Sequence, residues 1–517
     1  MPNNKTTYNF DRNRKRKALI AASVLAGLTV FGSAGFLLYE KYTPRLASVT
    51  ANECSPSPTH YTFSSTGPNR FSVDLVIDGG TDQLDIVSRN DASERVLTDD
   101  FIKNARLVLA DGAEEPLSYQ GVGTWAVPHS QGDVLTIRYD IEANHDTYGW
   151  RNGKEEIAYN FDGSSFFTGW TVLLADYARQ SCASLITFDL PEGWLVAAPW
   201  QKLGENSYRI ENIRHLQKNG FAVGPSMPQF EVSAGQSKLV IVYERAVEHI
   251  AKAAAADADA LFKYYQNAYG GPAGGSYHVF MVSDAGTDGG AFEASFAQRF
   301  SVPSNKADAK VWQHGFAHEI GHLWNGIALR PSVSSDAEWF KEGVTDYMTI
   351  KAKYATGDVS ASRLEEKIAT VIRRYYLALF AKGPQSLVAA GARKQDNRML
   401  IYGGGAVFAL LLDGEMHKAM GAGAFERTLK ALYANRSEPY TQEQLMTALD
   451  QASNGRASAI LADLDAGLMP EVMKQQLAGL KLGLGVFAPE ELYVTFDVED
   501  CDRFEGECIP AFMRAHK

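Results

Sequence analysis

The sequence predicts a multidomain α+β protein that begins with an apolar helix. Three observations predict this class: an uncharged run near the N-terminus, short alternating segments from about 50 to 246, and long helical patterns from about 247 onward. With 517 residues, of which 45% are hydrophobic, the chain is large enough to build more than one core.

The N-terminal segment is predicted to be a membrane anchor that follows a basic tail. Residues 1–17 carry six basic side chains against Asp11, and residues 18–39 are uncharged. At about 1.5 Å per residue this run is long enough to cross a bilayer. Basic residues hold their end in the cytoplasm, so the remainder would lie on the extracytoplasmic side, periplasmic or extracellular. A cleaved signal peptide, cut near residues 32–34, is the alternative.

Residues 50–246 are predicted to form an all-β sandwich domain. Apolar and polar residues alternate in segments such as 71–75 and 135–139, as they do in strands with one buried face. Gly, Asp, Asn and Pro turns separate these segments. We therefore expect two packed sheets here.

Helical patterns dominate the rest of the chain. An alanine-rich helix is expected from 246 to 269, ended by Gly270, and an apolar edge strand from 277 to 282. Further helices are expected over 363–380, 406–420 and 442–480. These patterns indicate one domain over 247–420 and a helical segment over 421–485.

Four cysteines in a translocated chain predict disulfides rather than metal ligands. Cys501 and Cys508 bracket a short acidic loop and are expected to pair. This would close the C-terminal tail, residues 486–517, and would leave Cys54 to pair with Cys182.

One motif predicts a metal centre. His318 and His322 are four residues apart, so on a helix both rings reach one side, with Glu319 beside them and Glu342 twenty residues after His322. Two histidines and a glutamate are the protein ligands of a catalytic Zn²⁺, one per chain, with an open position for water. Surface helices with incidental histidines are the alternative.

Two neighbours of this motif are assigned supporting roles. Asp346 lies one helical turn after Glu342 and can accept the free ring N–H of a ligating histidine. His314 extends the histidine row by one turn, but three consecutive turns do not converge easily on one tetrahedral ion. His314 is therefore expected to line the site rather than to bind the metal.

The residues around these ligands resemble the gluzincin metallopeptidases, and among them the glycyl aminopeptidase-like family, which is related to the aminopeptidase N family. Residues 318–325 (HEIGHLWN) resemble the zinc helix of that family, and residues 339–347 (WFKEGVTDY) its third-ligand helix. Nineteen residues separate His322 from Glu342, one more than in the aminopeptidase N family. The resemblance implies a thermolysin-like zinc peptidase domain over 247–420.

The same resemblance implies further site residues. Tyr402 in the segment 401–406 corresponds to the tyrosine that faces the zinc; without the resemblance it would be a core tyrosine beside a glycine-rich turn. The segment 288–293 resembles the part that holds a substrate's amino terminus, which makes Gly289, Gly290 and Glu293 candidate substrate-binding residues. Ala294 departs from the histidine usual there.

The ligand set also predicts the chemistry. Zinc activates water, and Glu319, which is beside the ligands, can take its proton as general base. Tyr402 would then stabilise the oxyanion with a neutral hydroxyl. An aminopeptidase acting on peptides is favoured. An endopeptidase on the same site, a zinc-retaining protein that binds peptides without cutting them, and a hydrolase for a non-peptide substrate remain alternatives.

Charge limits the partners. The formal net charge is −11 for the whole chain and +5 for residues 1–17, which leaves −16 for the remainder. An acidic body of this kind argues against nucleic acid. The sequence predicts no oligomeric state.

Overall fold

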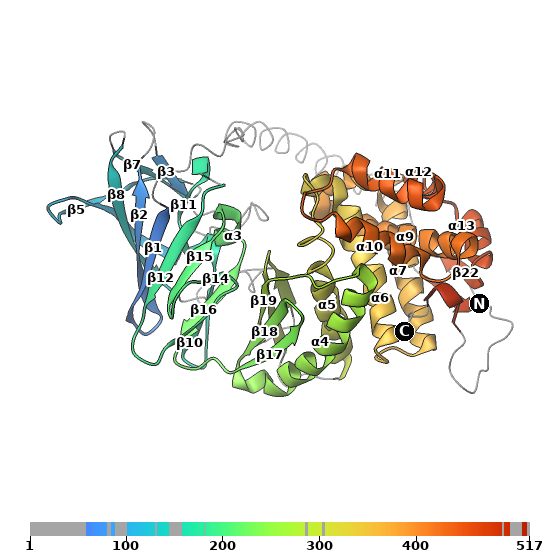
Figure 1. Ribbon diagram of the computed structural model, residues 1–517, viewed down its shortest axis with the longest axis horizontal. Coiled ribbons are helices and arrows are strands. Elements are labelled where there is room, and N and C mark those ends of the chain that lie inside the picture. The colour runs from blue at the N-terminus through green and yellow to red at the C-terminus, as the bar shows by residue number, and fades with distance from the viewer. Residues whose placement is uncertain are drawn as a thin grey trace, which may run out of the picture. The chain divides into compact units, whose positions relative to one another are not determined.

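The computed structural model describes residues 58–79, 84–87, 101–121, 123–129, 132–143, 158–179, 181–284, 288–301, 306–488, 491–496 and 509–513. The predicted anchor and its basic tail lie outside these residues, and so do Cys54, Cys501 and Cys508. The membrane and disulfide predictions therefore remain predictions. The described residues, all of which lie within 54–517, form one compact unit of mixed α and β structure, shown in Figure 1.

An all-β region comes first. Its largest sheet contains, in spatial order, β14 (Gln201–Lys202), β15 (Ser207–Ile210), β12 (Ser184–Asp189), β1 (Thr59–Gly67), β2 (Arg70–Asp78), β8 (Val134–Glu142), β4 (Ile102–Val108) and β5 (Glu114–Pro116). A four-stranded sheet contains β13 (Leu195–Ala197), β16 (Gly220–Gly224), β10 (Ser164–Thr168) and β9 (Tyr159–Phe161). Another contains β11 (Ala175–Asp176), β3 (Leu84–Val87), β7 (Thr124–Val127) and β6 (Ser118–Gly121).

The period-2 pattern of the sequence explains how these sheets pack. Every second residue of β2 and β8 is buried, which gives each strand one apolar face. Phe63 of β1 lies 5.4 Å from Phe167 of β10 and 5.6 Å from Phe221 of β16, measured between ring centroids. One core is thus shared between the large sheet and the sheet of β10 and β16.

A five-stranded sheet follows, with the order β17 (Gln229–Ala234), β18 (Ser237–Tyr243), β19 (Ser276–Asp284), β21 (Ser295–Ser301) and β20 (Asp288–Ala291). This arrangement corrects two expectations. The boundary predicted at 246 assigned β17 and β18 to the β domain, whereas β18 pairs with β19 and β17 pairs with β18 in the same sheet. The strand expected at the edge, 277–282, lies inside β19, between β18 and β21, and β20 occupies the edge.

Helices form the remainder, together with the C-terminal hairpin of β22 (Leu482–Ala488) and β23 (Glu491–Phe496). The long helices are α4 (Glu248–Tyr269), α5 (Lys306–His322), α6 (Thr345–Ala355), α7 (Ala361–Lys382), α9 (Arg398–Met420), α10 (Ala424–Ala434), α11 (Gln442–Ser453), α12 (Arg456–Asp465) and α13 (Pro470–Ala478). Shorter helical segments are α2 (Gly169–Val172), α3 (Ile213–Gln217), α8 (Leu387–Ala390), η4 (Tyr177–Arg179), η5 (Arg245–Val247), η6 (Ser334–Ala337), η7 (Trp339–Val344), η8 (Gly391–Asn397) and η9 (Ala511–Met513).

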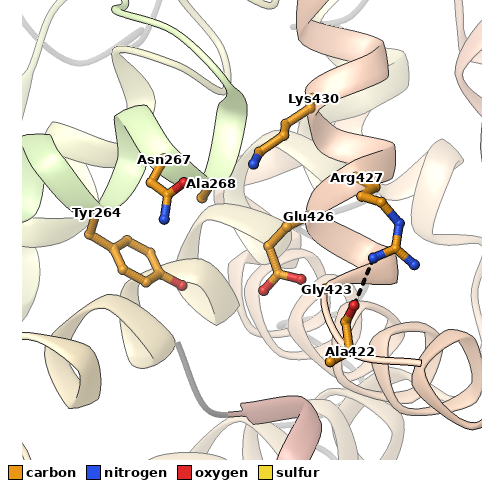
Figure 2. Close-up of a pocket in the computed structure, with 8 residues that line it drawn as sticks. All are labelled: Tyr264, Asn267, Ala268, Ala422, Gly423, Glu426, Arg427 and Lys430. Carbon is orange, nitrogen blue, oxygen red and sulfur yellow. Dashed lines mark hydrogen bonds between the residues drawn. The ribbon is translucent and has the colours of Figure 1, made fainter. Parts of the chain in front are cut away.

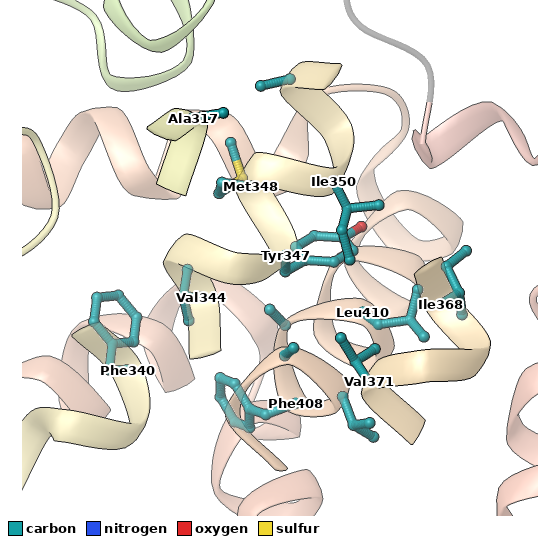
Figure 3. Packing of buried hydrophobic residues seen from close by; sticks show 14 of the residues in the cluster. Ala317, Phe340, Val344, Tyr347, Met348, Ile350, Ile368, Val371, Phe408 and Leu410 are labelled. Atoms are coloured by element: carbon teal, nitrogen blue, oxygen red, sulfur yellow. The ribbon is translucent and has the colours of Figure 1, made fainter. Parts of the chain in front are cut away.

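The helices share an apolar core built from α5, η7, α6, α7 and α9, part of which is shown in Figure 3. Phe340 and Val344 come from η7, Tyr347 and Met348 from α6, and Phe408 from α9. Among the described residues, one helical stretch, Leu387–Met420, is long and apolar enough to cross a membrane, and it is mostly buried in this core. The core positions the predicted metal-site residues and Tyr402, which lie on α5, η7, α6 and α9.

Glycines allow η7 and α9 to approach backbone to backbone. Gly403, Gly404 and Gly405 are inside α9, which corrects the glycine-rich turn considered for this segment. A Cβ atom on Gly343 would lie 2.3 Å from the Cα of Gly405, and one on Gly405 would lie 2.1 Å from the carbonyl oxygen of Trp339. This contact places Tyr402 beside the segment that carries Glu342.

We predict that Gly405→Ala destabilises the fold, because the added methyl would collide with backbone that cannot rotate away. Overpacking of this kind costs about 1–3 kcal/mol. Urea unfolding checks the prediction. Gly315→Ala on α5 is the matched control, since a Cβ there meets no heavy atom within 4 Å, and it should be neutral or stabilising by up to about 1 kcal/mol. Equal stability of the two variants would contradict the prediction.

Candidate metal centre

The first two candidate ligands lie at the end of helix α5. Phe316 and Ile320 are buried in the helical core, and His318 and His322 are buried on another side of the helix. The helix ends at His322. Gly326 then turns the chain with φ = 128°, a backbone conformation that favours glycine. The pair Asn325-Gly326, which is typical of helix ends, thus lies within a few residues of the observed end.

The third candidate ligand, Glu342, lies in η7, which is a π-helical turn that leads into α6. The sequence predicted a plain helix here, and π-turns inside helices occur frequently at functional sites. Asn325 is fully buried and joins the two ligand-bearing segments: its side-chain amide donates to the carbonyl oxygen of Phe340 (3.1 Å) and to Oγ1 of Thr345 (3.1 Å). The loop after His322 is thereby fixed against η7.

The three side chains converge on one point. Nε2 of His318 and Nε2 of His322 each lie 3.2 Å from the same carboxylate oxygen, Oε2 of Glu342. Zinc binds histidine nitrogen and carboxylate oxygen at about 2.0–2.2 Å, so neighbouring ligand atoms of a tetrahedral site lie about 3.3 Å apart. The observed separations therefore fit a zinc ion held by His318, His322 and Glu342.

The other ring nitrogens are oriented by hydrogen-bond partners. Nδ1–H of His322 donates to the carbonyl oxygen of Asn325 at 3.0 Å, and Nδ1 of His318 lies 3.6 Å from Oδ1 of Asp346. Both arrangements direct an Nε2 lone pair toward the metal position. His314 makes the shorter contact with Oδ1 of Asp346, 2.8 Å through its Nε2.

Arg374 holds the other oxygen of Asp346. Its Nη1 lies 2.9 Å from Oδ2. Asp346 is buried. Burial raises its pKa, but the hydrogen bond from His314 and the nearby His318 outweigh burial and keep the pKa well below the usual value. The carboxylate is thus ionised at neutral pH and can orient both histidines.

Of the candidate ligands, His318 holds its proton tightly. Burial lowers the pKa of His318, but the carboxylates of Asp346 and Glu342 outweigh it and raise the pKa to about 10. For Glu342, burial raises the pKa, but His322, Lys341 and Lys394 lower it well below its usual value. A metal must therefore displace a proton from His318.

Glu319 and Tyr402 lie beside these ligands. Glu319 is half-buried, and its carboxylate lies within 4.8 Å of a ring nitrogen of both His318 and His322. The ring of Tyr402 stacks on that of His318, with 5.7 Å between centroids, and its hydroxyl is close enough to the Glu342 carboxylate to be affected by its charge. Burial and the Glu342 carboxylate raise the pKa of Tyr402 well above 10, so the hydroxyl stays protonated and can donate a hydrogen bond.

The candidate substrate-binding residues lie at the edge of the five-stranded sheet. Gly289 and Gly290 are in β20, and Glu293 follows it. The backbone N–H of Glu293 donates to the carbonyl oxygen of Lys218 at 2.8 Å, and its Oε1 lies 3.2 Å from Nε of Arg214. Residues of the β region therefore contact this segment directly.

Two cavities among the described residues lie away from the metal ligands. One, of about 210 Å³, lies between α4 and α10 and is lined by residues such as Tyr264, Glu426 and Lys430 (Figure 2). A larger one, of about 960 Å³, is lined by α10, α11 and the loop between them. Neither is lined by a metal-site residue, so the donor atoms, rather than cavity size, identify this site.

Sequence reasoning missed the residues that support the site from a distance. Arg374 lies on α7 and Lys394 on η8, far from the motif and outside any recognisable pattern. Asn325 belongs to the segment that resembles the zinc helix, but the sequence does not show that its side chain links the two ligand segments. The contacts of Arg374 and Lys394 form only when α7 and η8 pack against the segments that carry the metal ligands.

The fold and the converging donors define a mixed α+β protein with a candidate mononuclear metal centre. The fold is similar to the crystal structure of an aminopeptidase N family protein from Idiomarina loihiensis, with a TM-score of 0.67, 17% sequence identity, and coverage of 83% of this chain and 79% of the other. This likeness shows an aminopeptidase N-like fold. No family model matches the chain, and no curated protein matches it in sequence.

We predict that the metal-free protein binds one Zn²⁺ and that the affinity falls as the pH falls. Because the pKa of His318 is about 10 without metal, protons compete below that pH, by up to about tenfold per pH unit. Calorimetric titration at several pH values checks this. Glu342→Gln should weaken binding at every pH, and a pH-independent affinity would contradict the prediction.

Proposed function

We propose that this protein is a zinc-dependent peptidase, with aminopeptidase activity as the favoured form. The observation that carries the proposal is the convergence of two histidine nitrogens on one oxygen of Glu342, with Glu319 and Tyr402 beside them. The aminopeptidase N-like fold supports it. The finer assignment, to the glycyl aminopeptidase-like family of gluzincins, rests on the motif residues alone.

In this proposal each residue has one role. His318, His322 and Glu342 would hold the zinc, which when bound lowers the pKa of water and polarises a carbonyl. Glu319 takes a proton from the attacking water and passes it to the nitrogen of the leaving amine as the C–N bond breaks. The neutral hydroxyl of Tyr402 donates a hydrogen bond to the oxygen on which negative charge develops.

The edge strand β20 supports peptide as the substrate. The backbone of an extended peptide can pair with a strand at the edge of a sheet. In the described part of the five-stranded sheet, β20 is an edge strand. Glu293 would hold the α-amino group of such a peptide. Its present partner, Arg214, is 62% exposed, so their ion pair is weak and can be displaced.

Mass-spectrometric mapping of a peptide library tests this function. With the protein from about Ala51 onward, we expect stepwise loss of N-terminal residues that Glu319→Gln abolishes, because general-base catalysis contributes about 10²–10⁴-fold. Glu293→Ala should then weaken N-terminal trimming. Internal cuts would instead make the protein an endopeptidase. Intact peptides with both proteins would count against peptidase function and favour peptide binding or a non-peptide substrate.

We further propose a single-pass membrane location, with residues 1–17 cytoplasmic and the metal centre extracytoplasmic. The uncharged run 18–39 after a basic tail supports it. The full chain should remain in membranes after alkaline extraction, and intact mass should include residues 1–17. A mature N-terminus near residue 34 would show a cleaved signal peptide instead.

A further inference from the structure

The two carboxylate oxygens of Glu342 have different partners. Oε2 faces Nε2 of both histidines at 3.2 Å. Oε1 lies 2.7 Å from Nζ of Lys394 and 3.2 Å from Nζ of Lys341. One oxygen thus faces the metal position, and the other is engaged by ammonium groups.

We propose that Lys394 is a positioning residue that retains Oε1 of Glu342, so that Glu342 binds the metal through Oε2 alone. The proposal rests on the metal site of the proposed function and deepens it. Lys394 belongs to η8 and lies outside every motif that predicted the site.

Lys394 is better placed than Lys341 to retain Oε1 of Glu342. Nζ of Lys394 bridges two carboxylates at hydrogen-bonding distance, Glu342 at 2.7 Å and Glu338 at 2.8 Å. The corresponding distances from Lys341 are 3.2 Å and 3.8 Å. The carboxylates of Glu338 and Glu342 are almost fully buried, with 9% and 3% of each side chain exposed. The charge-assisted contacts of Lys394 with these two carboxylates are therefore well shielded from water.

The fold fixes Lys394 from two directions. Oγ of Ser334 donates to Oε1 of Glu338 at 2.7 Å, which orients the carboxylate that Lys394 shares. Gly391, at the start of η8, packs on the backbone of η6: a Cβ there would lie 1.8 Å from the carbonyl oxygen of Ser335. Thus η8, which carries Lys394, packs against η6, which leads into Glu338.

Single-oxygen binding matters for the open coordination position. A catalytic zinc site needs three protein ligands and an accessible position for water or substrate. If Oε1 also turned to the metal, Glu342 would occupy a further position. The ammonium of Lys394 opposes that rotation and also reduces the negative charge that Glu342 brings to the metal.

Cobalt substitution tests the proposal without relying on activity. Co²⁺ reports its coordination number through its visible absorption, which weakens as that number rises. In the full chain, Lys394→Met and Lys394→Gln should each retain about one Co²⁺ but absorb more weakly than the parent. Lys394→Arg, which keeps the cation, should restore most of the parent spectrum. On a cleaved peptide, kcat should fall about 10–100-fold in the Met variant with little change in KM.

Lys382→Met is the matched control. Nζ of Lys382 donates to the carbonyl oxygen of Asp396 and to Oδ1 of Asn397 in the same segment, without a described contact to Glu342. Its Co²⁺ spectrum should match that of the parent.

Two results would overturn the proposal: an unchanged spectrum when Lys394→Met and Lys394→Gln both retain Co²⁺, or the same spectral change in Lys382→Met. If the spectra respond as expected while the parent cuts no peptide, the positioning role stands and the proposed function fails.

Discussion

The approach of two histidine nitrogens to one oxygen of Glu342 is the constraint on which the rest of the site depends. Three polar side chains are buried at this point, and buried charges are costly unless they are paired or bind a metal. The surroundings satisfy this requirement: Asn325 receives the N–H of His322, Asp346 lies beside His318, and lysines engage Oε1 of Glu342. Each of the three candidate ligands therefore has a specific neighbour that orients it.

This site needs two helical segments at an unusually short distance. Side chains larger than hydrogen at residues 343 and 405 would separate η7 from α9. With glycine at both positions, the ring of Tyr402 reaches the ring of His318. The backbone contact between residues 343 and 405 thus sets both the packing of the core and the geometry of the metal centre.

The sequence indicated much of this arrangement because the relevant signals are local. The spacing of His318 and His322 within one helix predicts a shared side, and the apolar pattern of α5 predicts its buried stripe. The glycines of α9 were misleading, because glycine is permissive in turns and is also required where backbones touch. Only the packing of η7 against α9 shows that these glycines lie inside a helix rather than in a turn. The roles of Lys394 and Arg374 could not be predicted because they also depend on packing. Their partners lie 52 and 28 residues away along the chain.

The strand order of the five-stranded sheet bears on how this protein can be divided. A fragment that begins at the expected boundary, residue 247, would lose β17 and β18 and leave β19 unpaired along one side. Residues 277–282 of β19 are all buried in the whole protein. Exposed apolar edge strands recruit other chains and promote aggregation. The part of the chain that carries the candidate metal centre is therefore expected to need the two strands that precede α4 when it is produced as a fragment.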